Sequence, residues 1–332
     1  MKTLRLFTLL PIFFVLLFSA CSDSVEPQEP AVPIVGHSTV ATNYLNEVLD
    51  VMEENSINRY NIDWSDFRAT VFAVTDGAIT IEDTYPGIEK ALELLADNHS
   101  FFVKPDGTGF SASTVRCNLD QVTVTSWPEN IGYVKVNSFS GGGNTTEALT
   151  FAQEIQQQIR DQDNDQLRGW IVDLRGNLGG NMWPMIAGIG PVLGEGIAGY
   201  FIDPDNNENS WGFANGASVS NGQFIITQIN NSYSLIAPNP KVAVLLNDGI
   251  ASSGEVIAIS FIGRDNTRSF GSGTCGLSTG NTTFPLSDGS NLFLTTVYLA
   301  DRDKNAYGGV VEPDVLIENE DIIQVASDWI LE

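Results

Sequence analysis

The stretch GWIVDLRGNLGGN at residues 169–181 predicts a buried β-strand that leads through a tight turn into a helix. Its apolar half ends at Asp173, and Gly176, Gly179 and Gly180 follow. Glycine adopts positive φ angles at little cost and lets another backbone or a ligand approach closely. The N–H groups of such a turn can bind an anion, stable or transient. A nucleotide-binding loop is not indicated, because the turn contains neither GxGxxG nor GKS/T. A purely structural turn is the alternative.

A second stretch, KVAVLLNDGIASSGEVIAISFIG at residues 241–263, repeats the pattern of apolar strand, sharp turn and helix. It places Ser252 and Ser253 at the start of the helix, where the helix dipole stabilises negative charge near a hydroxyl. One of these serines is therefore a candidate nucleophile, although a serine at this position can also be a simple N-cap. The stretch is not the GxSxG elbow of α/β-hydrolases, because residue 250 is isoleucine.

The chain has only two histidines, His37 and His99. His99 lies in LLADNHSFF at residues 94–102, where an amphipathic helix ends and two aromatic residues follow. A histidine there can simply satisfy the helix dipole. A serine nucleophile needs a base, however, and His37 falls in a tether-like segment where we expect it to be solvated. His99 is therefore the candidate base.

The rest of the chain predicts an α/β fold. Residues 38–112 show helical periodicity and are expected to form an N-terminal helical subdomain that carries His99. In residues 113–332, short apolar strands alternate with helices that begin near Asn181 and Ser252, which favours an α/β catalytic domain. The segment 201–236 is rich in Asn, Gly and Ser and is expected to form loops or a short hairpin.

The N-terminus predicts export. Residues 1–20 combine a charged start, an apolar stretch and a small-residue exit, as in a signal peptide. Cys21 follows directly and resembles the lipidated cysteine of a bacterial lipoprotein, and a plain secretory signal is the alternative. Residues 21–37 are polar, acidic and Pro-rich, which suits a flexible tether. We expect a lipid-anchored protein of the cell envelope, on the periplasmic face or the cell surface. An oxidising compartment permits a disulfide between Cys117 and Cys275, and the sequence leaves that pairing open.

Composition excludes several classes of protein. The chain has 16 Lys+Arg against 41 Asp+Glu, a net charge of −25, and 42% hydrophobic residues. The apolar content excludes an intrinsically disordered chain, and no nucleic-acid partner is expected for so acidic a chain. The three cysteines fit no zinc-site spacing. No metal and no cofactor are expected.

Together these stretches resemble the C-terminal-processing, or tail-specific, family of serine peptidases. The matching segments, in the family's order, are DLRGNLGG at 173–180, NDGIASSGE at 247–255, GSGTCGLSTGN at 271–281 and GGVVEPDV at 308–315. The resemblance implies a catalytic core similar to the Clp-protease/crotonase α/β spiral. It also implies that the nucleophile stands three residues before Glu255, at Ser252. No PDZ domain, which usually gates substrate tails in this family, is evident.

The resemblance also selects a catalytic branch. Members with a Ser–Lys dyad carry a lysine where this chain has Leu277, so the dyad is absent. The tricorn-like branch uses a histidine, which matches His99, and a supporting glutamate some 60 residues after the serine. That position corresponds to Glu312, with Asp301 as the second candidate.

The implied activity is hydrolysis of peptide bonds in a protein or peptide substrate. Ser252 would attack the carbonyl, His99 would take its proton, and Glu312 would orient the imidazole. The N–H groups of Gly179 and Ser253 would bind the oxyanion. For an ordinary imidazole, with a pKa near ~6.5, we expect activity to rise through roughly pH 6–7.5. Two other functions stay open: a non-catalytic module for apolar ligands on the same fold, and a lipid-anchored surface scaffold.

Overall fold

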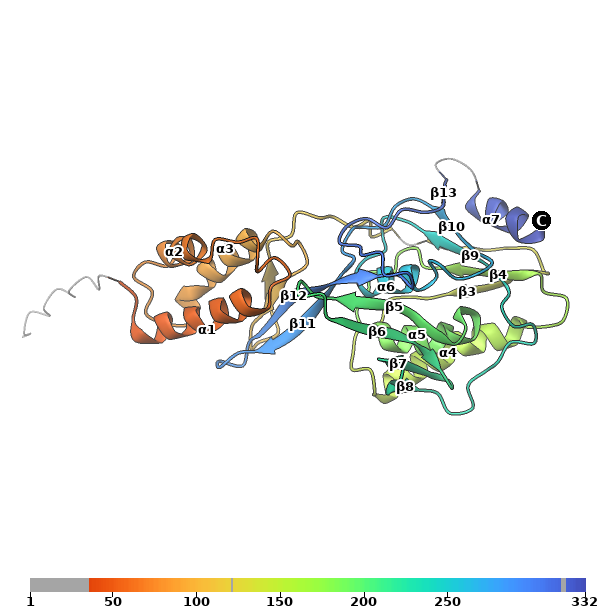
Figure 1. Ribbon diagram of the computed structural model, residues 1–332, viewed down its shortest axis with the longest axis horizontal. Helices are drawn as coiled ribbons and strands as arrows, with labels where there is room; N and C mark the ends of the chain where they lie inside the picture. The colour runs from red at the N-terminus through yellow and green to blue at the C-terminus, as the bar shows by residue number, and fades with distance from the viewer. Residues whose placement is uncertain (1–35, 121, 318–320) are drawn as a thin grey trace, which may run out of the picture. The chain divides into compact units, whose positions relative to one another are not determined.

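Two β-sheets, one parallel and one antiparallel, organise the computed structural model, which describes residues 36–120, 122–317 and 321–332 (Figure 1). The predicted signal peptide 1–20, Cys21 and most of the predicted tether 21–37 lie outside the described residues. No helix within the described ranges is long and apolar enough to cross a membrane.

The stretch around Asp173 forms β4 (Gly169–Asp173), an inner strand of the parallel sheet. Its strands run in the order β13-β10-β9-β4-β3. They are rich in Val, Ile and Leu because helices cover both faces. Helices α4, α5 and α6 pack on one face and α7 on the other, so the predicted α/β class is confirmed. The strands are β3 Gly132–Lys135, β4 Gly169–Asp173, β9 Lys241–Leu246, β10 Thr267–Gly271 and β13 Val315–Leu316, and the helices are α4 Thr146–Gln162, α5 Met182–Leu193, α6 Ser253–Ser260 and α7 Ile322–Leu331.

The antiparallel sheet runs β2-β1-β12-β5-β6-β7-β8, and β11 pairs with β12. The strands are β1 Phe101–Val103, β2 Gly109–Ser111, β5 Gly196–Ile202, β6 Glu208–Ala214, β7 Ala217–Ser220, β8 Phe224–Gln228, β11 Thr279–Pro285 and β12 Asn291–Ala300. The expectation of loops or one short hairpin over 201–236 understated the order of this region, which contains the three strands β6, β7 and β8.

Two Asn-Gly pairs explain those strands. Asn215-Gly216 joins β6 to β7 and Asn221-Gly222 lies between β7 and β8, and all four residues have positive φ. Asn-Gly with positive φ at both positions is the favoured two-residue hairpin turn. The polar composition of this segment therefore reflects turns and solvent-facing positions, while Trp211 and Val219 face inward.

The helical portion comprises α1 Thr39–Asn55, α2 Trp64–Val74, the 3₁₀ turn Glu82–Thr84 and α3 Tyr85–Leu95. Its apolar stripe forms a core that also includes Phe102 of β1 and Leu292 of β12, so these helices pack directly on the antiparallel sheet. His37 is half-buried, with Nε2 2.8 Å from Thr75 Oγ1, whereas the sequence suggested a solvated residue. The division at residue 112 stays a prediction.

Asp173 anchors the turn at the end of β4. Its fully buried carboxylate accepts hydrogen bonds from Arg175 Nε and Nη2 at 2.9 and 2.8 Å and from Tyr133 Oη at 2.8 Å. Lys135 Nζ lies 3.4 Å away. Burial opposes ionisation, but Arg175 and Lys135 outweigh it and hold the pKa of Asp173 below its usual value. Asp173 and Arg175 therefore form a buried ion pair at the end of β4.

Replacing Asp173 should therefore be costly. Asp173→Ala would leave two partly buried cations without their counter-charge, a loss of about 3–5 kcal/mol in the free energy of unfolding. Asp205→Ala is the matched control, because it removes the partner of Arg59 at a side chain that is 48% exposed, where solvent screening leaves only a small loss. Urea unfolding of both variants tests this, and equal losses would contradict it.

Candidate active site

The turns after β4 and β9 meet beside β11 at one cavity of about 920 Å³. Turns that follow parallel strands gather at the carboxyl edge of a sheet, which is where ligands bind in open α/β folds. Ser252, Ser253 and Gly180 line the cavity from the parallel sheet, while His99 and Thr279 line it from the antiparallel side. Aromatic side chains form much of the wall, and no Asp, Glu, Lys or Arg is among the described residues that line it.

Ser252 stands at the N-terminus of α6 with φ 53° and ψ −120°. Residues other than glycine rarely adopt this backbone conformation, which costs of the order of ~1–3 kcal/mol and is typical of functional sites. The predicted strand–turn–helix around Ser252 is therefore present, with the serine at a strained helix start.

A buried carboxylate holds this strained turn. Ser252 N–H donates to Glu255 Oε2 at 2.8 Å. Glu255 Oε1 accepts from Thr274 Oγ1 at 2.6 Å and from Gly276 N–H at 3.0 Å. Burial raises the pKa of Glu255 to about 7, although these hydrogen bonds oppose the shift.

In the sequence, Glu255 marked only the position of Ser252, and its role in holding the turn was not predicted. The signal was present, since a serine followed three residues later by glutamate is the pattern of a capping box.

His99 lies between α3 and β1, and β11 fixes it. Its Nδ1 is 2.8 Å from Thr279 Oγ1, and its carbonyl oxygen accepts from Asn281 Nδ2 at 2.9 Å. Burial lowers the pKa of His99 from 6.5 to about 4, and the negative charge of Asp97 opposes that shift. The imidazole is therefore neutral near pH 7. When Nδ1–H donates to Thr279, Nε2 is left as a proton acceptor.

The glycine turn after β4 packs against the serine. A Cβ added to Gly179, whose φ is +94°, would lie 2.6 Å from the carbonyl oxygen of Ala251 and 2.9 Å from Ser252 Cβ. The N–H of Gly179 donates to Asn177 Oδ1 at 3.0 Å, so it is not free to bind an oxyanion as the resemblance implied. Within the described ranges, the N–H groups of Gly180 and Ser253 donate to no protein acceptor, and both residues line the cavity.

The model of the family described as Peptidase family S41 matches residues 130–317, more than half of the chain. The chain belongs to peptidase family S41. A nisin-resistance protein from Lactococcus lactis subsp. lactis is 26% identical over 293 residues, 86% of each chain. The carboxy-terminal processing protease CtpA of Bacillus subtilis (strain 168) is 29% identical over 166 residues, which cover 50% of this chain and 30% of CtpA. The predicted C-terminal-processing family and the serine-type peptidase class are thus confirmed.

Solved structures agree with this S41 fold. A lipoprotein from Streptococcus agalactiae superposes with a TM-score of 0.69 at 22% identity, covering 89% of this chain and 97% of that one. The photosystem II D1 C-terminal processing protease superposes with a TM-score of 0.58 at 16% identity, covering 87% and 98%.

In this S41 peptidase the prediction that Glu312 orients His99 is wrong. Glu312 is exposed and lines a separate cavity of about 510 Å³ with Arg264 and Tyr307, while the imidazole Nδ1 has Thr279 as its partner. The segment that carries Glu312 is tied to the Thr274 loop through Val311, whose N–H donates to Thr274 Oγ1 at 2.9 Å. The Glu312 carboxylate lies beside Gly273, where a Cβ would be 3.0 Å from Oε2.

Asp301, the second candidate, is also engaged elsewhere. It is buried, and its carboxylate accepts from the N–H groups of Asp303 and Asn305 and from Tyr307 Oη at 3.0 Å. It closes its own loop after β12. Asp97 is the carboxylate whose charge acts on the imidazole of His99. Over the described part of the chain, no group of three His, Cys, Asp or Glu side chains could hold a metal ion.

The packing of Gly179 gives a direct test of the S41 site. Gly179→Ala should lower kcat/KM by ~100-fold or more, because the added methyl would displace Ala251 and Ser252. Gly222→Ala is the matched control: its φ is +70°, but no atom lies within 4 Å of the added Cβ. It should keep near-parent activity with a modest fall in Tm. Steady-state kinetics and thermal unfolding measure both, and an active Gly179→Ala enzyme would show that the turn does not position the serine.

Proposed function

We propose that this S41 peptidase is an exported, lipid-anchored endopeptidase that cleaves peptide bonds through an acyl-enzyme on Ser252, with His99 as general base. The observation that supports it most is the common cavity, which brings a strained helix-terminal serine and a neutral imidazole together from distant parts of the chain.

The proposed reaction has two halves. Ser252 Oγ attacks the peptide carbonyl while His99 Nε2 takes the hydroxyl proton, and the imidazolium then gives that proton to the leaving amine. A water molecule, deprotonated by His99, cleaves the acyl-enzyme and returns Ser252 to its starting state. No hydrogen bond joins Ser252 to His99 among the described residues, and such contacts commonly form only when substrate is bound.

The oxyanion would be bound by the N–H groups of Ser253 and Gly180. Both line the cavity, and Ser253 stands in the first turn of α6, where the helix dipole favours negative charge. Each such donor is typically worth about 3–4 kcal/mol of transition-state stabilisation. Gly180 thus takes the role that the resemblance gave to Gly179.

Similar proteins and the N-terminal sequence support a cellular location and a first substrate for this peptidase. The signal-like N-terminus with Cys21, together with the fold shared with a streptococcal lipoprotein, favours an anchored protein of the cell envelope. The relative that aligns over 86% of this chain is a nisin-resistance protein, so nisin is the first substrate to test. The uncharged, aromatic wall of the cavity suits apolar side chains beside the cleaved bond.

The test is labelling with a fluorophosphonate probe, followed by mass mapping of the adduct. The parent protein should carry the adduct on Ser252, the Ser252→Ala variant should carry none, and a variant at an exposed serine, Ser65→Ala, should label like the parent. A folded parent protein that never labels, beside an active control hydrolase, would refute the proposal. A co-purifying apolar ligand in such a protein would favour the binding module that the aromatic cavity also fits.

The pH profile tests the base. His99 must be neutral to accept a proton, and burial lowers its pKa to about 4, so kcat/KM should rise through about pH 4 and then level off. This window lies below the pH 6–7.5 expected for an ordinary imidazole. His99→Ala should abolish both the activity and the rise of kcat/KM with pH. His37→Ala should change neither.

The measurement is kcat/KM from pH 3.5 to 8, with circular dichroism at each pH to confirm folding. An inflection near pH 7 that is lost in Glu255→Gln belongs to Glu255, whose pKa burial raises to about 7. Near-parent rates in His99→Ala would refute the assignment of the base.

A further inference from the structure

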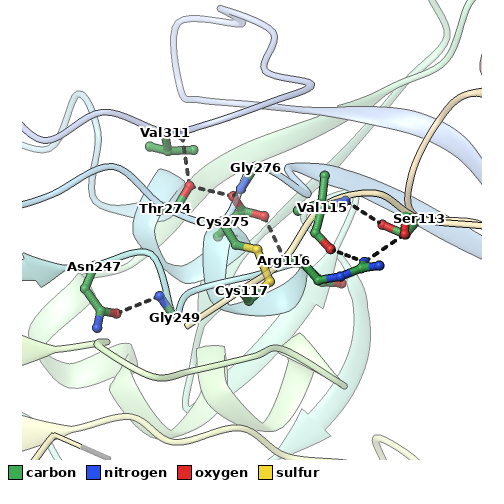
Figure 2. Close-up of a disulfide and its surroundings, with 12 residues drawn as sticks. Ser113, Val115, Arg116, Cys117, Asn247, Gly249, Thr274, Cys275, Gly276 and Val311 are labelled. Carbon is green, nitrogen blue, oxygen red and sulfur yellow. Dashed lines mark hydrogen bonds between the residues drawn. A yellow bond between two sulfur atoms is a disulfide. The ribbon is translucent and has the colours of Figure 1, made fainter. Parts of the chain in front are cut away.

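A segment without helix or strand, residues 113–120, crosses from β2 toward the nucleophile turn, and we call it the strap. A disulfide joins Cys117 of the strap to Cys275, with the two Cα atoms 5.1 Å apart (Figure 2). This settles the pairing that the sequence left open. Both cysteines are partly accessible to solvent, so a small reductant can reach the bond.

Cys275 lies within the set of contacts that holds Ser252. Its N–H donates to the carbonyl oxygen of Ile250 at 2.8 Å, two residues before the serine. Its neighbours Thr274 and Gly276 donate to the Glu255 carboxylate that accepts the Ser252 N–H. A shift of Cys275 would therefore move the groups that fix the nucleophile.

The other end of the strap reaches the base. Thr114 N–H and Oγ1 donate to Asn98 Oδ1 at 2.9 and 3.0 Å, and Asn98 directly precedes His99. Asn98 has a positive φ of 59°, so a specific backbone conformation leads into the imidazole residue. Arg116 stiffens the strap between these points, since its Nη1 donates to the carbonyl oxygens of Ser113 and Val115 (Figure 2).

Apart from the disulfide, the strap makes few contacts with the segment that carries Ser252. Asn118 N–H donates to the carbonyl oxygen of Asp248 at 3.1 Å, and Leu119 beside it is 70% exposed. The covalent bond is thus the main link that fixes the strap there. The same short segment touches both the base-bearing and the serine-bearing parts of the site.

We propose that the Cys117–Cys275 disulfide positions the nucleophile turn and the general base relative to each other, so that hydrolysis depends on the redox state of this bond. The inference rests on the proposed roles of Ser252 and His99. A dithiol would supply the reducing equivalents: its two electrons and two protons convert the S–S bond into two thiols, and the dithiol closes to its own disulfide.

The test compares oxidised and reduced full-length protein. Dithiothreitol treatment should lower kcat, and the rate of fluorophosphonate labelling of Ser252, by ~10-fold or more, while KM changes by less than ~3-fold, because small displacements of reacting groups mainly affect the chemical step. Reoxidation with glutathione disulfide should restore the rate. The double variant Cys117→Ser/Cys275→Ser should have the reduced rate and should not respond to dithiothreitol.

The outcomes separate the two proposals. If the oxidised protein does not label at Ser252, the proposed function fails. If it labels, and the reduced protein labels and turns over equally fast, the function stands and the positioning role is refuted. Reduction of any disulfide that closes a long loop is expected to lower the Tm. Circular dichroism at the assay temperature is therefore the control that the reduced protein is still folded. Loss of the fold on reduction would also refute the proposal, even if the double variant cannot be prepared.

Discussion

The site depends on the hydrogen bonds that the buried carboxylate of Glu255 accepts. The carboxylate accepts from the strained Ser252 N–H and from two donors of the loop that carries Cys275, and no cation neutralises it among the ion pairs of the described residues. Three hydrogen bonds partly replace the water that burial removes, yet burial still raises the pKa of the group to about 7. Such a group is retained at a cost in stability, and here it fixes a serine backbone that would otherwise relax.

The proposed base, His99, differs from the histidine of the familiar catalytic triad in the group that contacts its ring. A carboxylate on the imidazole would raise its pKa and stabilise the imidazolium that forms during attack. His99 instead meets a neutral hydroxyl, Thr279, and burial keeps the ring unprotonated. Asp97 supplies the nearby negative charge. The ring is thus always ready to accept a proton near neutral pH, while the imidazolium receives less stabilisation than a directly bonded carboxylate would give.

Much of this could be predicted from the sequence, because local patterns encode local structure. The apolar runs ending at Asp173 and Leu246, and the helix starts at Asn181 and Ser252, correspond to β4, β9, α5 and α6. The two Asn-Gly pairs were equally local signals, but the polar composition around them concealed the strands β6 to β8. The partner of the imidazole could not be found in this way. Thr279 and Glu312 both follow Ser252 in the sequence, and their separations from it do not show which one contacts His99. The pairing of β11 with β12 places Thr279 beside the imidazole.

Charge explains why the error fell on Glu312. The family resemblance implied a carboxylate some 60 residues after the serine, but a carboxylate moved into the uncharged cavity would lose its hydration with no cation there to offset the loss. A threonine hydroxyl costs far less to bury, and it can accept a hydrogen bond from Nδ1–H of the ring. The exposed position of Glu312 and the neutral wall around His99 are therefore consistent with each other. Among the described residues, the wall of this cavity contains no charged side chain, and the acid that holds the serine turn, Glu255, lies behind that turn and accepts three hydrogen bonds.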